Sequence, residues 1–379
     1  MTEFDRSTVS KLVAQLAELG LVREEEAAQR GAGRPGRPSH NVAVTDHMVS
    51  LVVHPETDAV TVGCVAMGGR VLRQVRCPTL GSPSAAEVVN MATAIVDGMR
   101  NGLDRQHHII GVAVAVPGRV DRTLGTVLSA PNLGWSDVPL GPMLERALDL
   151  EVSIGTDAMA GALAECAFGV GRKAADFVYL HGGESGIRGA IVISGRLLSG
   201  SREQAGEFGH TLVRTDGARC RCGRTGCLET EVDRTSLLLA AGLEPERAAE
   251  LPAVLSDLGR NADGSSLLRQ TAREQLQYLL TGVENVVRAL DPEAVVLGGF
   301  LGPLLASAGD LSRASSGPRS TENAGSRCLP ALILDDGALI GAAELVFARL
   351  LADPFYRPRN AKVASVESAD PYTGSASCT

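Results

Sequence analysis

Three short runs rich in β-forming residues occur twice along the chain, each time in the order strand, turn, strand, turn, strand. The runs are 48–53, 59–66 and 70–75 in the first set, and 177–180, 189–193 and 196–198 in the second. Two halves that begin in the same way indicate an internal duplication. Such halves face each other across a cleft, where ligands usually bind. The sequence therefore predicts an α/β protein with two similar lobes and a ligand site between them.

Apolar periodicity extends this pattern to the rest of the chain. It predicts helices at 84–101, 159–166, 234–242, 264–290 and 338–351, and buried strands at 109–116, 152–154 and 294–297. A further helix is predicted at 7–22, where Asp5 or Ser7 can cap the start and Gly20 can end it.

These elements divide the chain into three parts. A short N-terminal domain covers 1–45, a large two-lobed domain covers 46–352, and a polar tail covers 353–379. The tail has the composition of a disordered segment. Residues 308–327 are expected to form a flexible surface loop.

Composition restricts the class of protein. Apolar residues make up 44% of the chain and charged residues 21%, which is typical of a soluble globular protein. The formal net charge of -8 argues against a surface that binds nucleic acid throughout, although a local basic patch remains compatible with it. No apolar run approaches the roughly 20 residues that span a bilayer. We therefore expect a cytoplasmic protein with no membrane partner, in which the cysteines do not form a disulfide framework.

Three cysteines cluster behind a histidine, in the order His210, Cys220, Cys222, Cys227. One imidazole and three thiolates are the ligands of a closed, tetrahedral, structural zinc site. The alternative is three buried free cysteines near a chance histidine, but cysteines rarely cluster by chance in a reducing compartment. The segment 207–229 is therefore predicted to be a zinc loop.

Acidic side chains flank this cluster. Glu207 lies three residues before His210, and Glu229 lies two residues after Cys227. Carboxylates that accept paired hydrogen bonds from neighbouring hydroxyls are suited to a sugar site. The alternative is that both are surface acids on a loop.

Two more polar residues could reach a ligand. Asp157 follows the predicted strand 152–154, where it could act as a base for a sugar hydroxyl or could cap the next helix. Spacing alone favours the cap. Asn132 lies in a Gly/Pro-rich loop with Trp135 and offers both a donor and an acceptor, although this loop could also be an ordinary turn.

Three segments together resemble the ROK family, named for repressors, open reading frames and kinases. They are Glu207-Phe208-Gly209-His210, the cysteine cluster from Cys220 to Glu229, and 291–299, which reads Asp-Pro-Glu-Ala-Val-Val-Leu-Gly-Gly. The resemblance extends over about residues 7–353, and it implies a two-lobed, actin-like or hexokinase-like fold with a sugar in the cleft. It also implies that His210 binds zinc through one nitrogen and faces the sugar with the other. The sugar-contacting positions that it implies are Asn132, Asp157, Glu207, His210 and Glu229.

The chain departs from the kinases of this family where the phosphates of ATP would bind. Those kinases have an Asp-x-Gly-Gly turn between the first two strands, whereas residues 54–58 read His-Pro-Glu-Thr-Asp. This turn contains a proline, which has no N–H to donate to a phosphate, and it places Glu56 near the phosphate position. Arg188 occupies the second phosphate turn, where a small residue is usual, and Thr156 replaces the Asn before the catalytic Asp. Because phosphoryl transfer depends on positioning and electrostatics, we expect no catalytic residue, with Asp157 a degenerate base position.

The N-terminal domain resembles part of the winged helix-turn-helix of the family's regulators. Residues 5–11 are similar to its recognition helix, and 33–38, with the repeated Gly-Arg-Pro, are similar to the wing tip. The DNA-binding residues implied are Arg6, Ser7, Thr8, Ser10, Lys11, Arg34 and Arg37. The alternative is a solvated amphipathic helix with a basic linker. Because the first helices of the motif are missing before Arg6, we expect either that they are encoded upstream of Met1 or that this form binds DNA weakly.

The sequence thus favours a sugar-responsive transcriptional regulator, in the simplest case a repressor. Its expected partners are operator DNA and a sugar or sugar phosphate, and its expected assembly is a homodimer or homotetramer. An ATP-dependent, glucokinase-like sugar kinase is the first alternative, and a pure ligand-binding protein is the second. The altered phosphate turn and the added N-terminal helix argue against the kinase.

Overall fold

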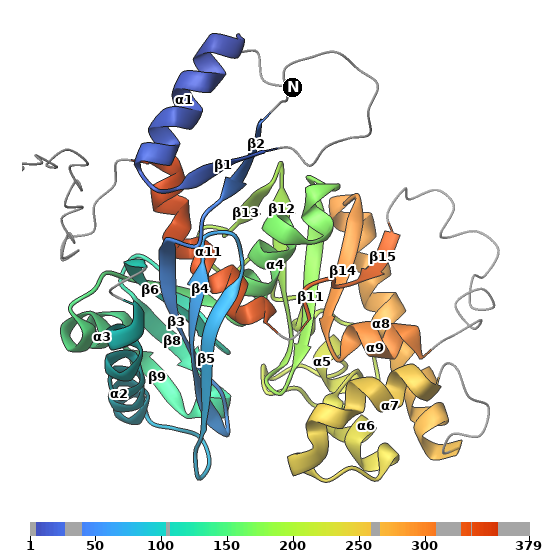
Figure 1. The fold of residues 1–379 in the computed structure, drawn as a ribbon. Helices are drawn as coiled ribbons and strands as arrows, with labels where there is room; N and C mark the ends of the chain where they lie inside the picture. The colour runs from blue at the N-terminus through green and yellow to red at the C-terminus, as the bar shows by residue number, and fades with distance from the viewer. Residues whose placement is uncertain are drawn as a thin grey trace, which may run out of the picture.

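The computed structural model describes residues 5–26, 40–103, 107–258, 266–307, 327–334 and 336–354. It contains two five-stranded sheets, one in each lobe, and a small N-terminal unit at the top of the view in Figure 1. The tail from residue 355 onward and residues 308–326 of the predicted loop 308–327 lie outside the described residues, and so do Arg34 and Arg37 of the predicted wing. Arg327, the last residue of the predicted loop, instead begins a strand.

The first lobe is built on a sheet with the strand order β10-β6-β3-β4-β5. Its strands are β3 (Met48–Pro55), β4 (Ala59–Ala66), β5 (Val71–Pro78), β6 (His108–Val116) and β10 (Val152–Thr156). Two helices, α2 (Ala85–Leu103) and α3 (Leu140–Leu148), pack against each other and share one buried core with the sheet. The near-continuous apolar sequence of β4 agrees with its burial along the whole strand.

The second lobe is built on a sheet with the order β13-β12-β11-β14-β15. Its strands are β11 (Phe177–Gly183), β12 (Gly186–Ile193), β13 (Arg196–Leu198), β14 (Ala294–Gly299) and β15 (Arg327–Pro330). Its main helices are α6 (Arg234–Ala241), α7 (Leu251–Leu258), α8 (Ser266–Leu290) and α9 (Leu301–Ala306). Their apolar faces form the core of this lobe together with one face of the sheet.

The two sheets have the same topology, which confirms the predicted duplication. In each lobe the first three strands form an antiparallel meander. The fourth strand then pairs in parallel with the first, and the fifth pairs in parallel with the fourth. The α/β class and the two-lobed architecture are therefore as the sequence predicted.

Two helices join the lobes at the centre of the molecule (Figure 1). α11 (Gly337–Ala352) lies on β3 and β6 of the first lobe, whereas α4 (Asp157–Phe168) contacts β11 and β12 of the second. The two helices are packed closely, since a Cβ added to Gly341 would lie 1.6 Å from the carbonyl oxygen of Ala160. The buried carboxylate of Glu165 accepts hydrogen bonds of 2.7 Å from the backbone N–H groups of Leu332 and Ile333. It thereby fixes the segment before α11 to α4.

The N-terminal unit consists of one helix and one hairpin. The carboxylate of Asp5 accepts a 2.8 Å hydrogen bond from the N–H of Thr8 and so caps α1 (Arg6–Glu18). The predicted helix 7–22 was too long, because Gly20 adopts a left-handed φ of 72° and the chain then turns into β1 (Val22–Glu26). β1 pairs antiparallel with β2 (His40–Val44).

The N-terminal unit is anchored on α11. Leu16, Leu19 and Leu21 pack into the cluster that contains the apolar residues of α11. On the outer face of α1, Val9 and Leu12 are 37% and 43% exposed.

The five helices predicted in the large domain are all present, with ends that differ by at most two residues from those expected. The sequence did not predict the small sheet of β7 (Arg119–Asp121), β8 (Thr126–Ala130) and β9 (Trp135–Val138). Trp135, expected in a loop, begins β9 and is buried, and its Nε1 donates a 3.1 Å hydrogen bond to the carbonyl of Pro83. Of the helices that the structure describes, none is both long and apolar enough to cross a membrane.

Candidate functional site

A cleft of about 1430 Å³ lies between the two lobes. Its first-lobe wall includes Thr57 in the β3–β4 turn and Asn132 after β8, and its second-lobe wall includes the β11–β12 turn and parts of 204–235. Four of the five predicted sugar-contacting residues line this cleft, namely Asn132, Glu207, His210 and Glu229. The fifth, Asp157, does not line the cleft. It lies beside Arg188, which does line it.

The four predicted metal ligands converge at one point. The ligand atoms of His210, Cys220, Cys222 and Cys227 all lie within 4.8 Å of one another. Cys220 Sγ is 3.5 Å from His210 Nδ1, and Cys222 Sγ is 3.6 Å from Cys227 Sγ. This group could hold one metal ion, and one imidazole with three thiols fits the donor set of a closed zinc site.

Backbone hydrogen bonds within the loop bring these ligands together. The N–H of Cys220 donates to the carbonyl of Arg224 at 2.7 Å, and the N–H of Gly226 donates to the carbonyl of Ala218 at 2.8 Å. Gly226 has a φ of 69°, and a Cβ at this position would lie 1.5 Å from the carbonyl oxygen of Arg214. Only glycine fits there, which explains why the cysteine cluster is punctuated by glycines.

The thiols of the cluster differ in their surroundings. Burial raises the pKa of Cys220 and of Cys227, whereas the backbone N–H of Arg224 lowers the pKa of Cys222. A bound divalent cation favours the thiolate form of its ligands and so would offset the effect of burial.

The two carboxylates that flank the cluster meet at the imidazole, as predicted. Glu229 Oε1 is 3.4 Å from His210 Nδ1 and accepts a 3.1 Å hydrogen bond from Cys220 Sγ. Glu207 Oε2 is 3.7 Å from His210 Nε2. The imidazole therefore presents Nδ1 to the thiol of Cys220 and Nε2 to Glu207. This arrangement would allow His210 to bind a metal on one side and a ligand on the other.

Asn132 is held by the opposite lobe. Its Oδ1 accepts a 2.6 Å hydrogen bond from Arg221 Nη1, and its Nδ2 donates to the carbonyl of Glu184 at 3.2 Å. A ligand that uses the Asn132 amide has to replace these contacts. Neither Arg221 nor Glu184 was predicted as a site residue, although the place of Arg221 between Cys220 and Cys222 was a signal that it belongs to the site.

The interpretation of Asp157 as a helix cap is wrong. The cap of α4 is Thr156, whose Oγ1 accepts a 3.1 Å hydrogen bond from the N–H of Met159. Asp157 is the first residue of the helix, and its Oδ1 lies 3.7 Å from Arg188 Nη1. The carboxylate therefore forms an ion pair with an arginine that lines the cleft.

The β3–β4 turn and the β11–β12 turn, at which the phosphate turns were expected, contact each other across the cleft. Thr57 Oγ1 in the first turn donates a hydrogen bond to Glu184 Oε2 in the second, and Arg234 Nη1 donates to Glu184 Oε1 at 2.6 Å. Glu56, expected near the phosphate position, instead accepts hydrogen bonds from Thr61 at 2.7 Å and from Arg76 at 3.2 Å. The acid that joins the two turns is thus Glu184.

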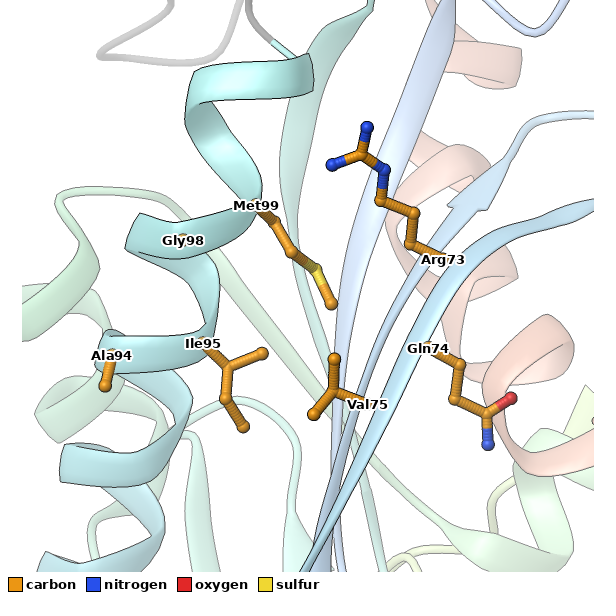
Figure 2. A pocket seen from close by; sticks show the side chains of 7 residues that line it. All are labelled: Arg73, Gln74, Val75, Ala94, Ile95, Gly98 and Met99. Carbon is orange, nitrogen blue, oxygen red and sulfur yellow. The ribbon is translucent and has the colours of Figure 1, made fainter.

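A second, smaller hollow of about 440 Å³ lies on the outer side of the first lobe, between β5 and α2 (Figure 2). Its lining is mainly apolar, and only Arg73 carries a charge among the residues Arg73, Gln74, Val75, Ala94, Ile95, Gly98 and Met99. None of the predicted ligands or acids lines this hollow.

Known proteins similar to this chain include both regulators and kinases. A xylose repressor from Caldicellulosiruptor bescii is 28% identical over 312 residues, which are 79% of this chain and 77% of that protein. A glucokinase from Halalkalibacterium halodurans is 32% identical over 247 residues, which are 61% of this chain and 74% of that protein.

Solved structures show the same architecture. A ROK family glucokinase from Streptomyces griseus, solved with glucose and AMPPNP, has a TM-score of 0.62 and 26% identity, covering 78% of this chain and 98% of that one. A ROK family transcriptional regulator, described as a homologue of the E. coli Mlc protein, has a TM-score of 0.70 and 23% identity, covering 91% of this chain and 89% of that one. The two-lobed fold is therefore of the sugar-kinase type, and the ROK family model matches residues 58–349. The chain belongs to the ROK family.

Proposed function

We propose that the chain is a sugar-responsive, DNA-binding transcriptional regulator, in the simplest case a cytoplasmic repressor, whose sugar domain does not phosphorylate its ligand. The observation that carries this proposal is the position of the N-terminal unit on α11. α11 contacts the first sheet and also α4, which contacts the second sheet. A change in the separation of the lobes would act on the joined pair of α4 and α11 and so would be transmitted to the unit that rests on α11.

The relatives support this interpretation. The fold shared with the regulator homologous to Mlc covers 91% of the chain, whereas the fold shared with the Streptomyces griseus glucokinase covers 78%. The larger share of the chain covered by the regulator is wide enough to include the N-terminal unit, which a kinase does not need. A repressor is also among the relatives with curated names.

The exposed face of α1 is the proposed contact with operator DNA. Ser7, Ser10 and Lys11 are exposed on this helix, and Thr8 is half-buried beside them. Together with Arg6, these are the residues that a recognition helix presents to bases and phosphates. Arg34 and Arg37 remain proposed wing contacts. The proposed DNA-bound form is a homodimer or homotetramer on a palindromic operator.

Replacing Lys11 by alanine should weaken DNA binding about equally on all sequences. The reason is that a lysine bound to a phosphate releases one counterion and reads no base. The salt slope of binding should fall by about one unit, measured by fluorescence anisotropy across a salt series. Lys173→Ala, which removes an exposed lysine of the sugar domain, is the matched control and should leave the slope unchanged. An unchanged slope in the Lys11 variant would remove this residue from the interface.

The proposed effector is a neutral or amino sugar, or its phosphate. Glu207, Glu229 and His210 line one wall of the cleft and would accept hydrogen bonds from neighbouring hydroxyls. Asn132 and Asp157 complete the proposed set. The proposed role of the metal is structural: zinc on His210 and the three cysteines holds both carboxylates in place.

Replacing Glu229 by alanine should weaken sugar binding by roughly 2 kcal/mol or more, because a charged hydrogen bond in the cleft is lost. Isothermal titration calorimetry measures this loss. Glu250→Ala, on the surface of the second lobe, is the control. Because Glu229 also contacts Cys220, the zinc content of both variants has to be measured. Equal affinity in the Glu229 variant and the parent would refute the assignment.

The rival function is a sugar kinase, and the glucokinases among the relatives favour it. The site argues against it, because Glu184 joins the two phosphate turns and Asp157 is paired with Arg188. A kinase assay separates the two functions.

A further inference from the structure

Arg188, which lines the cleft, has an unsatisfied hydrogen-bonding group. The side chain is 16% exposed and lines the cleft. Its Nη1 is buried, and no hydrogen-bond partner for it occurs within the described residues. The nearest acid is Asp157, whose Oδ1 is 3.7 Å away, beyond hydrogen-bond distance. A guanidinium has five donors in a planar fork, and a buried donor without a partner is unfavourable.

His181 adds a second unsatisfied group beside it. Arg188 on β12 is directly opposite His181 on β11 in the antiparallel register. Nδ1 of His181 is buried, and it too lacks a partner within the part of the chain that the structure describes. The ring stacks on Tyr179 with 6.2 Å between centroids, so its position is fixed. Burial lowers the pKa of His181, so the imidazole adds no positive charge beside Arg188.

The charges around this pair leave Arg188 available to an anion. Glu184 accepts hydrogen bonds from Thr57 and Arg234, so its negative charge is balanced by Arg234 and not by Arg188. His54 lies on the first-lobe side, and its Nδ1 is 2.9 Å from the carbonyl oxygen of Ala115. Among the described residues, the acid paired with Arg188 is Asp157, and an incoming anion would compete with it.

The sugar site and Arg188 lie close together along β12. A Cβ added to Gly186 would lie 2.6 Å from Glu229 Oε2. The carboxylate of Glu229 therefore contacts β12 at Gly186, which is two residues before Arg188. A ligand held by Glu229 could therefore extend an attached group toward the guanidinium. The planar fork of arginine matches a phosphate in a bidentate manner.

We propose that Arg188 forms a phosphate subsite and that the effector is a phosphorylated sugar. This inference rests on the proposed function, because it specifies the effector of the same cleft. Arg188 would exchange its long contact with Asp157 for two hydrogen bonds to the phosphate, while Glu207, His210 and Glu229 hold the sugar ring.

The test is calorimetry at constant ionic strength with the zinc-loaded full chain. The probes are glucose, mannose and N-acetylglucosamine, the 6-phosphate of each, and inorganic phosphate. At least one 6-phosphate should bind about tenfold or more tightly than its neutral parent. Arg188→Gln should abolish this gain and leave the affinity for the neutral sugar nearly unchanged, whereas Arg188→Lys should keep part of it. Arg119→Gln removes an exposed arginine from the first-lobe wall of the same cleft. This variant should keep the full gain in affinity for the 6-phosphate.

The outcomes separate this inference from the proposed function. If neutral sugars bind and their 6-phosphates bind no better, the phosphate subsite is refuted and sugar sensing stands. If Arg188→Gln weakens neutral and phosphorylated sugars equally, Arg188 only positions Asp157 and the inference fails. If inorganic phosphate binds the parent but not Arg188→Gln while every sugar fails, the subsite stands and sugar sensing fails. If no probe binds the folded parent, both are refuted.

Discussion

Removing the metal from the protein should cause the largest loss of stability of any single change. We expect one tightly bound zinc per chain, since the four ligand atoms lie within 4.8 Å of one another in a loop that backbone hydrogen bonds already close. Structural zinc contributes on the order of 10 kcal/mol of apparent folding free energy. Elemental analysis measures the zinc, and thermal unfolding with and without a chelator measures the loss.

Metal removal should also weaken sugar binding. Cys220 donates a hydrogen bond to Glu229 when it carries a proton, and zinc would remove that proton and free the carboxylate for a ligand. Cys222→Ser should lose zinc, while Cys77→Ser, which changes a half-buried cysteine of β5, should retain it. Purified, folded protein without zinc, or a chelator that leaves the unfolding temperature unchanged, would contradict the metal assignment.

The second large effect concerns ATP. We expect no measurable phosphorylation of hexoses or amino sugars in a coupled assay, because positioning and electrostatics carry almost all of phosphoryl transfer. Pro55 supplies no N–H to the first phosphate turn, and Glu184 ties that turn to the second. Thr57 and Arg234 occupy both carboxylate oxygens of Glu184. Asp157, at the degenerate base position, forms an ion pair of 3.7 Å with Arg188.

The positive control is the glucokinase from Halalkalibacterium halodurans. It should turn over glucose under the same conditions. Turnover by this chain in the range typical of kinases, about 1 to 100 per second, would contradict the proposal of a non-phosphorylating regulator and favour a sugar kinase.

The sequence predicted those features that are encoded locally. The duplication was visible because strand and helix periodicities repeat in the same order in both lobes. The metal cluster was visible because His210, Cys220, Cys222 and Cys227 are close in sequence and their chemistry is specific. The convergence of Glu207 and Glu229 on His210 followed from the same short segment.

Features that depend on contacts between distant parts of the chain were not predicted. Thr57 and Glu184 are 127 residues apart, and only the packing of the two lobes brings them together. Asn132 and Arg221 are 89 residues apart and meet for the same reason. The cap of α4 was misassigned by one residue, since Thr156 and Asp157 are both good caps and only the backbone decides between them.

The central claim is that a sugar in the cleft controls DNA binding, and a mobility-shift titration against the DNA that flanks the protein's own gene tests it most directly. The titration is run with and without each neutral sugar and sugar phosphate. We expect a specific complex whose affinity changes about fivefold or more with the sugar that binds the cleft. Glu229→Ala should form the complex but should not respond. No specific complex in any ligand state, or a sugar that binds the cleft and leaves the affinity for DNA unchanged, would contradict the claim.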